Sequence, residues 1–76
     1  MRADLLPKTP EGRIDHVVEE CGEVLKAIGK LRRFGARATD QQTGITYDNI
    51  GKLGLELLDL RRAIDMVLCD LSGDET

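Results

Sequence analysis

Two groups of acidic residues stand at spacings that suit the binding of a metal ion. Glu20 and Glu23 are three residues apart, and Glu56 and Asp59 repeat that spacing later in the chain. On a helix, residues three apart project from the same side. Carboxylates that converge repel one another, and Mg²⁺ or Mn²⁺ relieves this because these hard cations prefer oxygen ligands. These residues therefore predict a divalent metal site, with two solvated acidic helix faces as the alternative.

The first pair requires a helix, and the sequence around it predicts one over residues 9–34. Thr9 can serve as the N-cap, Pro10 suits the first helical position, and Gly35 suits the end. Apolar residues between these ends recur at the i, i+3, i+4, i+7 spacing of an amphipathic helix. They are Ile14, Val17, Val18, Cys21, Val24, Leu25, Ile28 and Leu31.

The second pair falls in a helix predicted over residues 46–71, with Thr46 as its N-cap and Ser72 at its end. The intervening residues 35–45 are polar and predict a loop. Residues 1–8 are expected to form an arm and residues 72–76 a tail. The sequence thus predicts one all-α domain over residues 1–76, in which the two helices pack as an antiparallel hairpin.

The second predicted helix carries more apolar surface than one partner helix can cover. At roughly 100° per residue its apolar residues fall into two separate stripes. The first contains Ile50, Leu53, Leu57, Leu60, Ile64, Val67 and Leu71, and the second contains Leu55, Leu58, Met66 and Cys69. One stripe should pack on the first helix and the other on another chain, since an exposed patch of this size marks an interaction site. We therefore expect a homo-oligomer in which hairpins form a four-helix bundle.

Composition narrows the class of protein. The chain has 76 residues and a net charge of −3, which argues against a nucleic-acid partner. It has no apolar run long enough for a membrane span and no signal-peptide pattern, so we expect a cytoplasmic protein. Cys21 and Cys69 are expected to be buried free thiols rather than a disulfide.

The acidic pairs belong to two longer motifs that resemble a known family. Residues 19–23 read EECGE and residues 56–59 read ELLD. This pattern of EExxE followed by ExxD on a later helix is similar to that of the MazG-like nucleotide pyrophosphohydrolases. The similarity extends over residues 13–71.

The resemblance implies an all-α protein that assembles as a dimer or tetramer and hydrolyses a nucleoside triphosphate to the monophosphate and pyrophosphate. Glu20, Glu23, Glu56 and Asp59 match the family's Mg²⁺ ligands, and Glu19 matches the residue that orients or deprotonates the attacking water. Many members continue past ExxD into further helix and basic or Asn residues that contact the nucleotide, whereas this chain is shorter there. The contacts to the base are therefore expected from residues 1–15, from a neighbouring subunit, or not at all.

Basic residues near the acidic pairs are predicted to contact the phosphates, namely Lys30, Arg33 and Lys52. The alternative for Lys52 is an ion pair with Glu56, four residues along the same helix. Two alternatives for the whole chain are a non-catalytic oligomeric scaffold and a regulatory metal-binding relative. A DNA-binding hairpin acting through the segment KLRRFGAR is disfavoured by the acidic balance of the chain.

Overall fold

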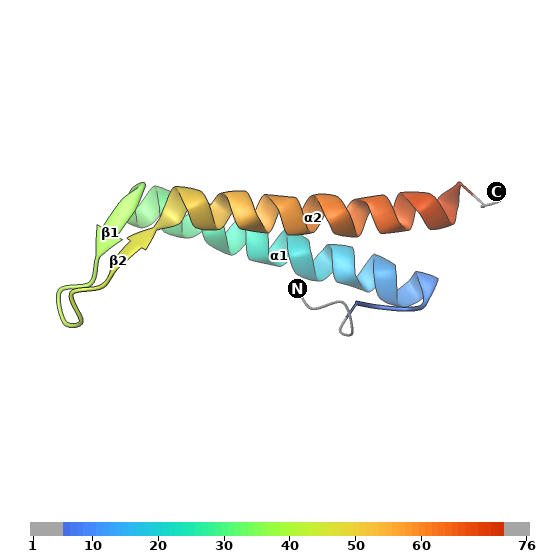
Figure 1. Cartoon of the computed structure of the whole chain (residues 1–76), viewed down its shortest axis with the longest axis horizontal. Coiled ribbons are helices and arrows are strands. Elements are labelled where there is room, and N and C mark those ends of the chain that lie inside the picture. Colours follow the sequence, from blue (N-terminus) through green and yellow to red (C-terminus); the bar gives the residue numbers. More distant parts are fainter. Residues whose placement is uncertain (1–5, 73–76) are drawn as a thin grey trace.

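Helix α1 spans Pro10–Phe34 and begins at the predicted cap (Figure 1). The Thr9 side chain accepts a hydrogen bond from the Gly12 N–H at 3.0 Å. The helix ends at Gly35, whose φ of 89° favours glycine and whose N–H donates to the Leu31 carbonyl. The computed structural model describes residues 6–72, so most of the predicted arm and most of the predicted tail lie outside the described residues.

The chain between the helices forms an antiparallel strand pair, which was not predicted. Strand β1 is Arg37–Thr39, inside the predicted loop over residues 35–45, and strand β2 is Thr46–Asp48, inside the predicted second helix; Ala38 lies opposite Tyr47. The turn between them is closed by the Asp40 carboxylate, which accepts hydrogen bonds from two backbone N–H groups. The fold is therefore mostly helical with one small strand pair, rather than purely α.

Helix α2 spans Asn49–Leu71, three residues shorter at its start than predicted. Its N-cap is Asp48 and not Thr46, because the Asp48 carboxylate accepts from the Gly51 N–H at 3.0 Å. Thr46 instead pairs in the sheet with Thr39, and their hydroxyl oxygens are 2.9 Å apart. Ser72 caps the end of the helix, as predicted.

The two helices lie side by side and antiparallel, and each end of the hairpin is held by a polar contact (Figure 1). At the open end, the Arg13 guanidinium makes two hydrogen bonds to the Asp70 carboxylate, at 2.6 and 2.9 Å. At the closed end, the Asn49 side-chain amide donates to the Gly35 carbonyl at 2.8 Å. The Arg13 guanidinium lowers the pKa of Asp70 below its ordinary value.

Small residues form much of the contact between the helices. Ala27 and Ala63 are almost completely buried, and Val24 is the third buried hydrophobic residue among those described. The predicted packing stripe of α2 is only partly correct: Leu53, Leu60 and Val67 are half-buried. The other four stripe residues are exposed, namely Ile50, Leu57, Ile64 and Leu71.

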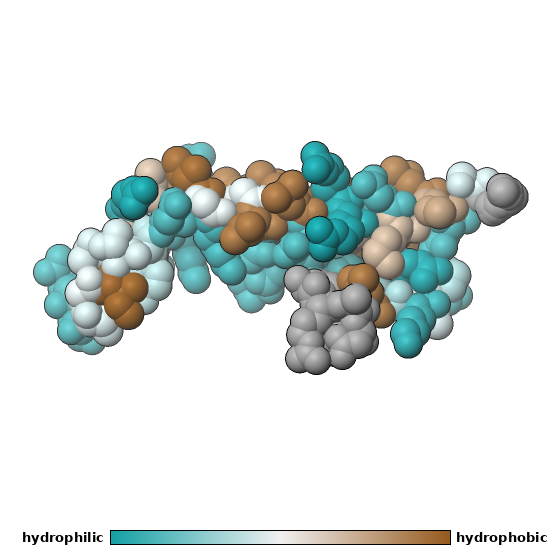
Figure 2. Space-filling view, viewed as in Figure 1, coloured by the Kyte–Doolittle hydropathy of each residue, from teal (hydrophilic) through white to brown (hydrophobic). Residues whose placement is uncertain are grey.

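Many of the exposed apolar residues gather on one side of the hairpin. We define the apolar face as Ile14, Val18, Cys21, Leu25 and Ile28 of α1 with Ile50, Leu57, Ile64, Leu68 and Leu71 of α2. On each helix, the residues of the apolar face lie about a quarter to a third of a turn around the helix axis from the buried residues, in the same sense along the chain. Because the two helices are antiparallel, the same sense of rotation places both sets of residues on one side of the hairpin. Leu55 and Leu58 of α2 are also exposed but stand outside this face, so hydrophobic patches are not confined to it. Figure 2 shows hydrophobic patches along α2 on one side of the molecule.

Two further sequence predictions can be checked here. Both cysteines are free, as expected, but the prediction that they are buried is wrong, because Cys21 and Cys69 are exposed. They occupy positions outside the inter-helix contact, where the monomer offers nothing to cover them. None of the described helices is long and apolar enough to cross a membrane.

Candidate metal centre

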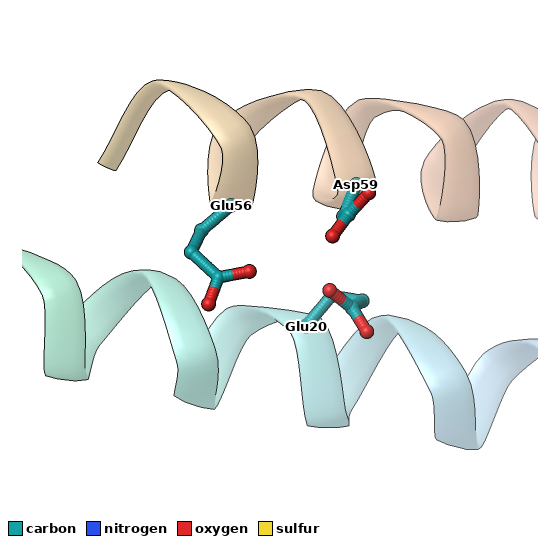
Figure 3. A group of neighbouring side chains, drawn as sticks. All are labelled: Glu20, Glu56 and Asp59. Carbon is teal, nitrogen blue, oxygen red and sulfur yellow. The ribbon is translucent and has the colours of Figure 1, made fainter. Parts of the chain in front are cut away.

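Three of the four predicted metal ligands meet between the helices. Glu20 of α1 and Glu56 and Asp59 of α2 each offer a carboxylate oxygen, and these oxygens lie within 4.8 Å of one another. Figure 3 shows Glu56 and Asp59 pointing from α2 toward α1, and Glu20 pointing into the space between them. We refer to these three residues as the carboxylate cluster.

Helical spacing explains why the cluster forms at the inter-helix contact. Glu20 stands seven residues before Ala27, and Glu56 stands seven residues before Ala63, so each glutamate lies two turns from an alanine on the same side. Both alanines are buried in the contact, and the glutamates are buried with them. The Glu20 and Glu56 side chains are each only 9% exposed. Both glutamates therefore lie inside the contact between the helices rather than on a solvated helix face.

Burial of negative charge makes the cluster electrostatically unfavourable without a cation. Loss of hydration is the main effect that raises the pKa of Glu20 above its ordinary value. The negative charges of Asp59, Glu56 and Glu23 raise this pKa further, and His16 opposes them. The repulsion among these carboxylates is the part of this effect that a bound cation would relieve.

Glu23 and Glu19 stand at the rim of the cluster. Glu23, the fourth predicted ligand, is outside the group of converging oxygens, and its carboxylate lies 3.4 Å from the Lys26 ammonium. Glu19, the predicted catalytic residue, is 76% exposed, and its Oε1 is 3.5 Å from His16 Nδ1. A shallow hollow connects these positions; its lining is Val18, Glu19, Glu20, Gly22, Glu23, Lys26, Glu56 and Asp59.

Two residues beside the cluster were not predicted from the sequence. His16 is buried, with Nδ1 3.9 Å from Glu20 Oε2. Lys26 contributes a positive charge to the rim of the hollow. The sequence does contain a signal for both: each stands one helical turn from Glu20 or Glu23, and residues three or four apart share a side of a helix.

The predicted phosphate-binding residues lie toward the closed end of the hairpin. Lys52 makes the ion pair with Glu56 that the sequence offered as an alternative, with Nζ 3.4 Å from Oε2. Lys30 and Lys52 line a groove beneath the strand pair. The Arg33 guanidinium lies 5.3 Å from the centre of the Phe34 ring, beside that groove.

The cluster fits a hard divalent cation. Its donors are all carboxylate oxygens, they come from two helices, and their mutual repulsion is the feature that a bound Mg²⁺ or Mn²⁺ removes. Comparison of the chain with known protein families, with curated proteins and with solved structures finds no match.

Proposed function

We propose that the protein hydrolyses a nucleoside triphosphate to the monophosphate and pyrophosphate in a reaction that depends on Mg²⁺ or Mn²⁺. The observation that carries the proposal is the convergence of Glu20, Glu56 and Asp59 within 4.8 Å at the contact between two helices. The resemblance of EECGE and ELLD to the MazG-like motifs supplies the reaction class. A triphosphate needs its charge neutralised before a nucleophile can attack it.

The roles of the residues follow from their positions. Glu20, Glu56 and Asp59 would hold the cation, with Glu23 able to join from the rim once it releases Lys26. The cation would neutralise phosphate charge and lower the pKa of water. Glu19, exposed beside the hollow, would accept a proton from the water that attacks the α-phosphorus. The bond from that phosphorus to the α,β-bridging oxygen then breaks, and pyrophosphate leaves with the electron pair.

The reaction is tested with a panel of ribonucleoside and deoxyribonucleoside triphosphates in the presence of Mg²⁺ or Mn²⁺. We expect pyrophosphate and monophosphate in equal amounts, abolished by EDTA. Release of orthophosphate in place of pyrophosphate would identify a different hydrolase. If no nucleotide in the panel is cleaved, the enzyme proposal fails and a regulatory metal-binding role becomes the better account.

A second proposal concerns assembly: two hairpins pair through their apolar faces to form a four-helix bundle. A chain this short is only marginally stable as a lone hairpin, and here only three hydrophobic residues among those described are buried. The hairpin measures 53 Å by 23 Å, so one side can supply the roughly 800 Å² per partner that a standard interface buries. This face also favours the alternative function of an oligomeric scaffold.

The two cysteines provide a direct test of this assembly. Cys21 belongs to the apolar face and Cys69 does not, although both are exposed in the single hairpin. In a bundle formed through this face, a small alkylating reagent should modify Cys69 much faster than Cys21. Leu25→Glu, which places a charge on the face, should equalise the two rates and produce monomers in sedimentation. Equal rates in the unaltered protein would contradict the proposed interface.

A further inference from the structure

A groove at the closed end of the hairpin contains both aromatic side chains of the chain. The protein has one Phe, one Tyr and no Trp. Phe34, the last residue of α1, and Tyr47, in β2, line the same groove, with Leu55 of α2 beside them. Both rings are about half exposed. Partly exposed aromatic rings that share one hollow offer flat apolar surface of the kind on which nucleobases stack.

The groove adjoins the carboxylate cluster. Lys52 lines the groove, and its ammonium lies 3.4 Å from the Glu56 carboxylate, so this one side chain touches both sites. Lys52 and Glu56 are one helical turn apart, about 6 Å along α2. Lys30 of α1 also lines the groove, and it stands two turns beyond Glu23. Positive charge therefore lies between the aromatic rings and the cluster.

The other charged groups in the groove have local roles. Asp40 and Asp48 also line it, but the Asp40 carboxylate closes the strand turn and the Asp48 carboxylate caps α2. Each is thus held by backbone N–H groups. The Arg33 guanidinium lies over the Phe34 ring, 5.3 Å from its centre. The arrangement suits a ligand with a flat ring at one end and negative charge at the other.

We propose that this groove is the nucleobase subsite: the base packs against Phe34 and Tyr47, and the phosphates pass Lys30 and Lys52 to the carboxylate cluster. This inference rests on the proposed triphosphate hydrolysis, and it supplies base contacts from within the same chain. It differs from the sequence expectation, which looked for them in residues 1–15 or in a neighbouring subunit. Stacking tolerates every base, so modest base selectivity is expected.

Tyr47 is the only tyrosine, which makes the groove directly observable. Protein labelled with 3-fluorotyrosine should give a single ¹⁹F resonance from Tyr47. With Mn²⁺ excluded and Mg²⁺ present, we expect this resonance to shift saturably with an α,β-methylene nucleoside triphosphate. Inorganic tripolyphosphate, which has the charge but no base, should leave it nearly unchanged. Equal shifts with both probes would overturn the proposal.

Substitution of the second ring gives an independent measurement. Phe34→Leu keeps an apolar side chain but removes the stacking surface, and it should weaken nucleotide binding by about 5- to 150-fold, the usual effect of losing one base-stacking ring. Tripolyphosphate affinity should not change. The matched control is Ile45→Ala, which truncates an exposed apolar residue of the strand turn that is outside the groove.

The outcomes separate this inference from the proposed function. A nucleotide that shifts the Tyr47 resonance without being cleaved would support the groove and refute hydrolysis. Efficient cleavage with no shift, or with unchanged nucleotide affinity in Phe34→Leu, would refute the groove and leave hydrolysis standing. A shift that depends on protein concentration and not on nucleotide would show that a second copy occupies the groove, which also overturns the inference.

Discussion

Replacing Glu20 by glutamine should stabilise the metal-free protein while removing its response to metal. The Glu20 carboxylate is buried beside Glu56 and Asp59, with oxygens within 4.8 Å. Two full charges at that distance repel by roughly 3.5 kcal/mol at an effective dielectric constant of about 20. His16 and Lys52 offset part of this repulsion, because each lies within 4 Å of a cluster carboxylate. We therefore expect Glu20→Gln to raise the free energy of unfolding by about 1–2 kcal/mol.

Bound metal should reverse the order of stability of Glu20→Gln and the unaltered chain. A cation present at a hundredfold excess over its dissociation constant stabilises the folded protein by about 2.7 kcal/mol. Glu20→Gln lacks one of the three converging ligands, so added metal should stabilise it little. Without metal the variant is then the more stable protein, and with saturating Mg²⁺ or Mn²⁺ the unaltered chain is.

The assay is urea denaturation followed by circular dichroism at one fixed protein concentration, with EDTA or with excess Mg²⁺. Fixed concentration matters because stability of an oligomer depends on it. Asp15→Asn is the matched control, since Asp15 is an exposed carboxylate of the same helix, and its effect should stay within about 0.5 kcal/mol. A metal-free Glu20→Gln protein less stable than the unaltered chain would refute the electrostatic reasoning, and an undiminished metal response would refute the site.

Three further predictions address other parts of the structure. Glu19→Gln should reduce turnover by about 10²–10⁴-fold while metal-induced stabilisation persists, whereas a mere surface acid would leave turnover unchanged in steady-state assays. Arg13 lowers the pKa of Asp70 in the folded protein, so the pair stabilises the fold fully at pH values above the pKa of Asp70 in the unfolded chain. This stabilisation is lost as the pH falls through the lower pKa of the folded state. Asp70→Asn should therefore make the free energy of unfolding, measured by urea denaturation, less dependent on pH in this acidic range. Ala63→Leu should destabilise the hairpin by about 1–3 kcal/mol in the same urea assay, because the buried alanine leaves no room, and no loss would mean that the helices pack on another face.

The helix boundaries were predictable where the local chemistry is strong. Thr9 with Pro10 and Gly35 at a positive φ leave few alternatives for the ends of α1. The strands were missed because each has only three residues, too few for an alternating pattern to register. Thr46 and Asp48 are both good N-caps, and only the pairing of Thr46 with Thr39 across the strands decides between them.

The packing face was harder to predict for a physical reason. An apolar stripe in the helical periodicity includes the residues of every apolar contact of a helix, both within the chain and with other chains. The periodicity does not show which residues of the stripe make which contact. Here the alanines bring the helices together, and the larger hydrophobic residues such as Leu25 and Leu57 remain exposed. The spacing of the acidic residues was more informative, because three of the four predicted ligands, Glu20, Glu56 and Asp59, converge in the structure. The fourth, Glu23, forms an ion pair with Lys26 instead.

The position of the carboxylate cluster ties stability to ligand binding in this fold. Glu20 and Glu56 occupy positions in the inter-helix contact that hydrophobic residues would fill in a hairpin selected for stability alone. The contact is consequently weak in apolar area and unfavourable in charge. Under the two proposals above, a cation at the cluster would remove the repulsion, and a second hairpin on the apolar face would supply further burial. The cluster lies in the inter-helix contact and the apolar face lies beside it, so metal binding and assembly should each strengthen the other through the pair of helices that they share. Metal titrations should therefore shift the monomer–oligomer equilibrium toward the oligomer, and Glu20→Gln should abolish that shift while leaving the apolar face unchanged.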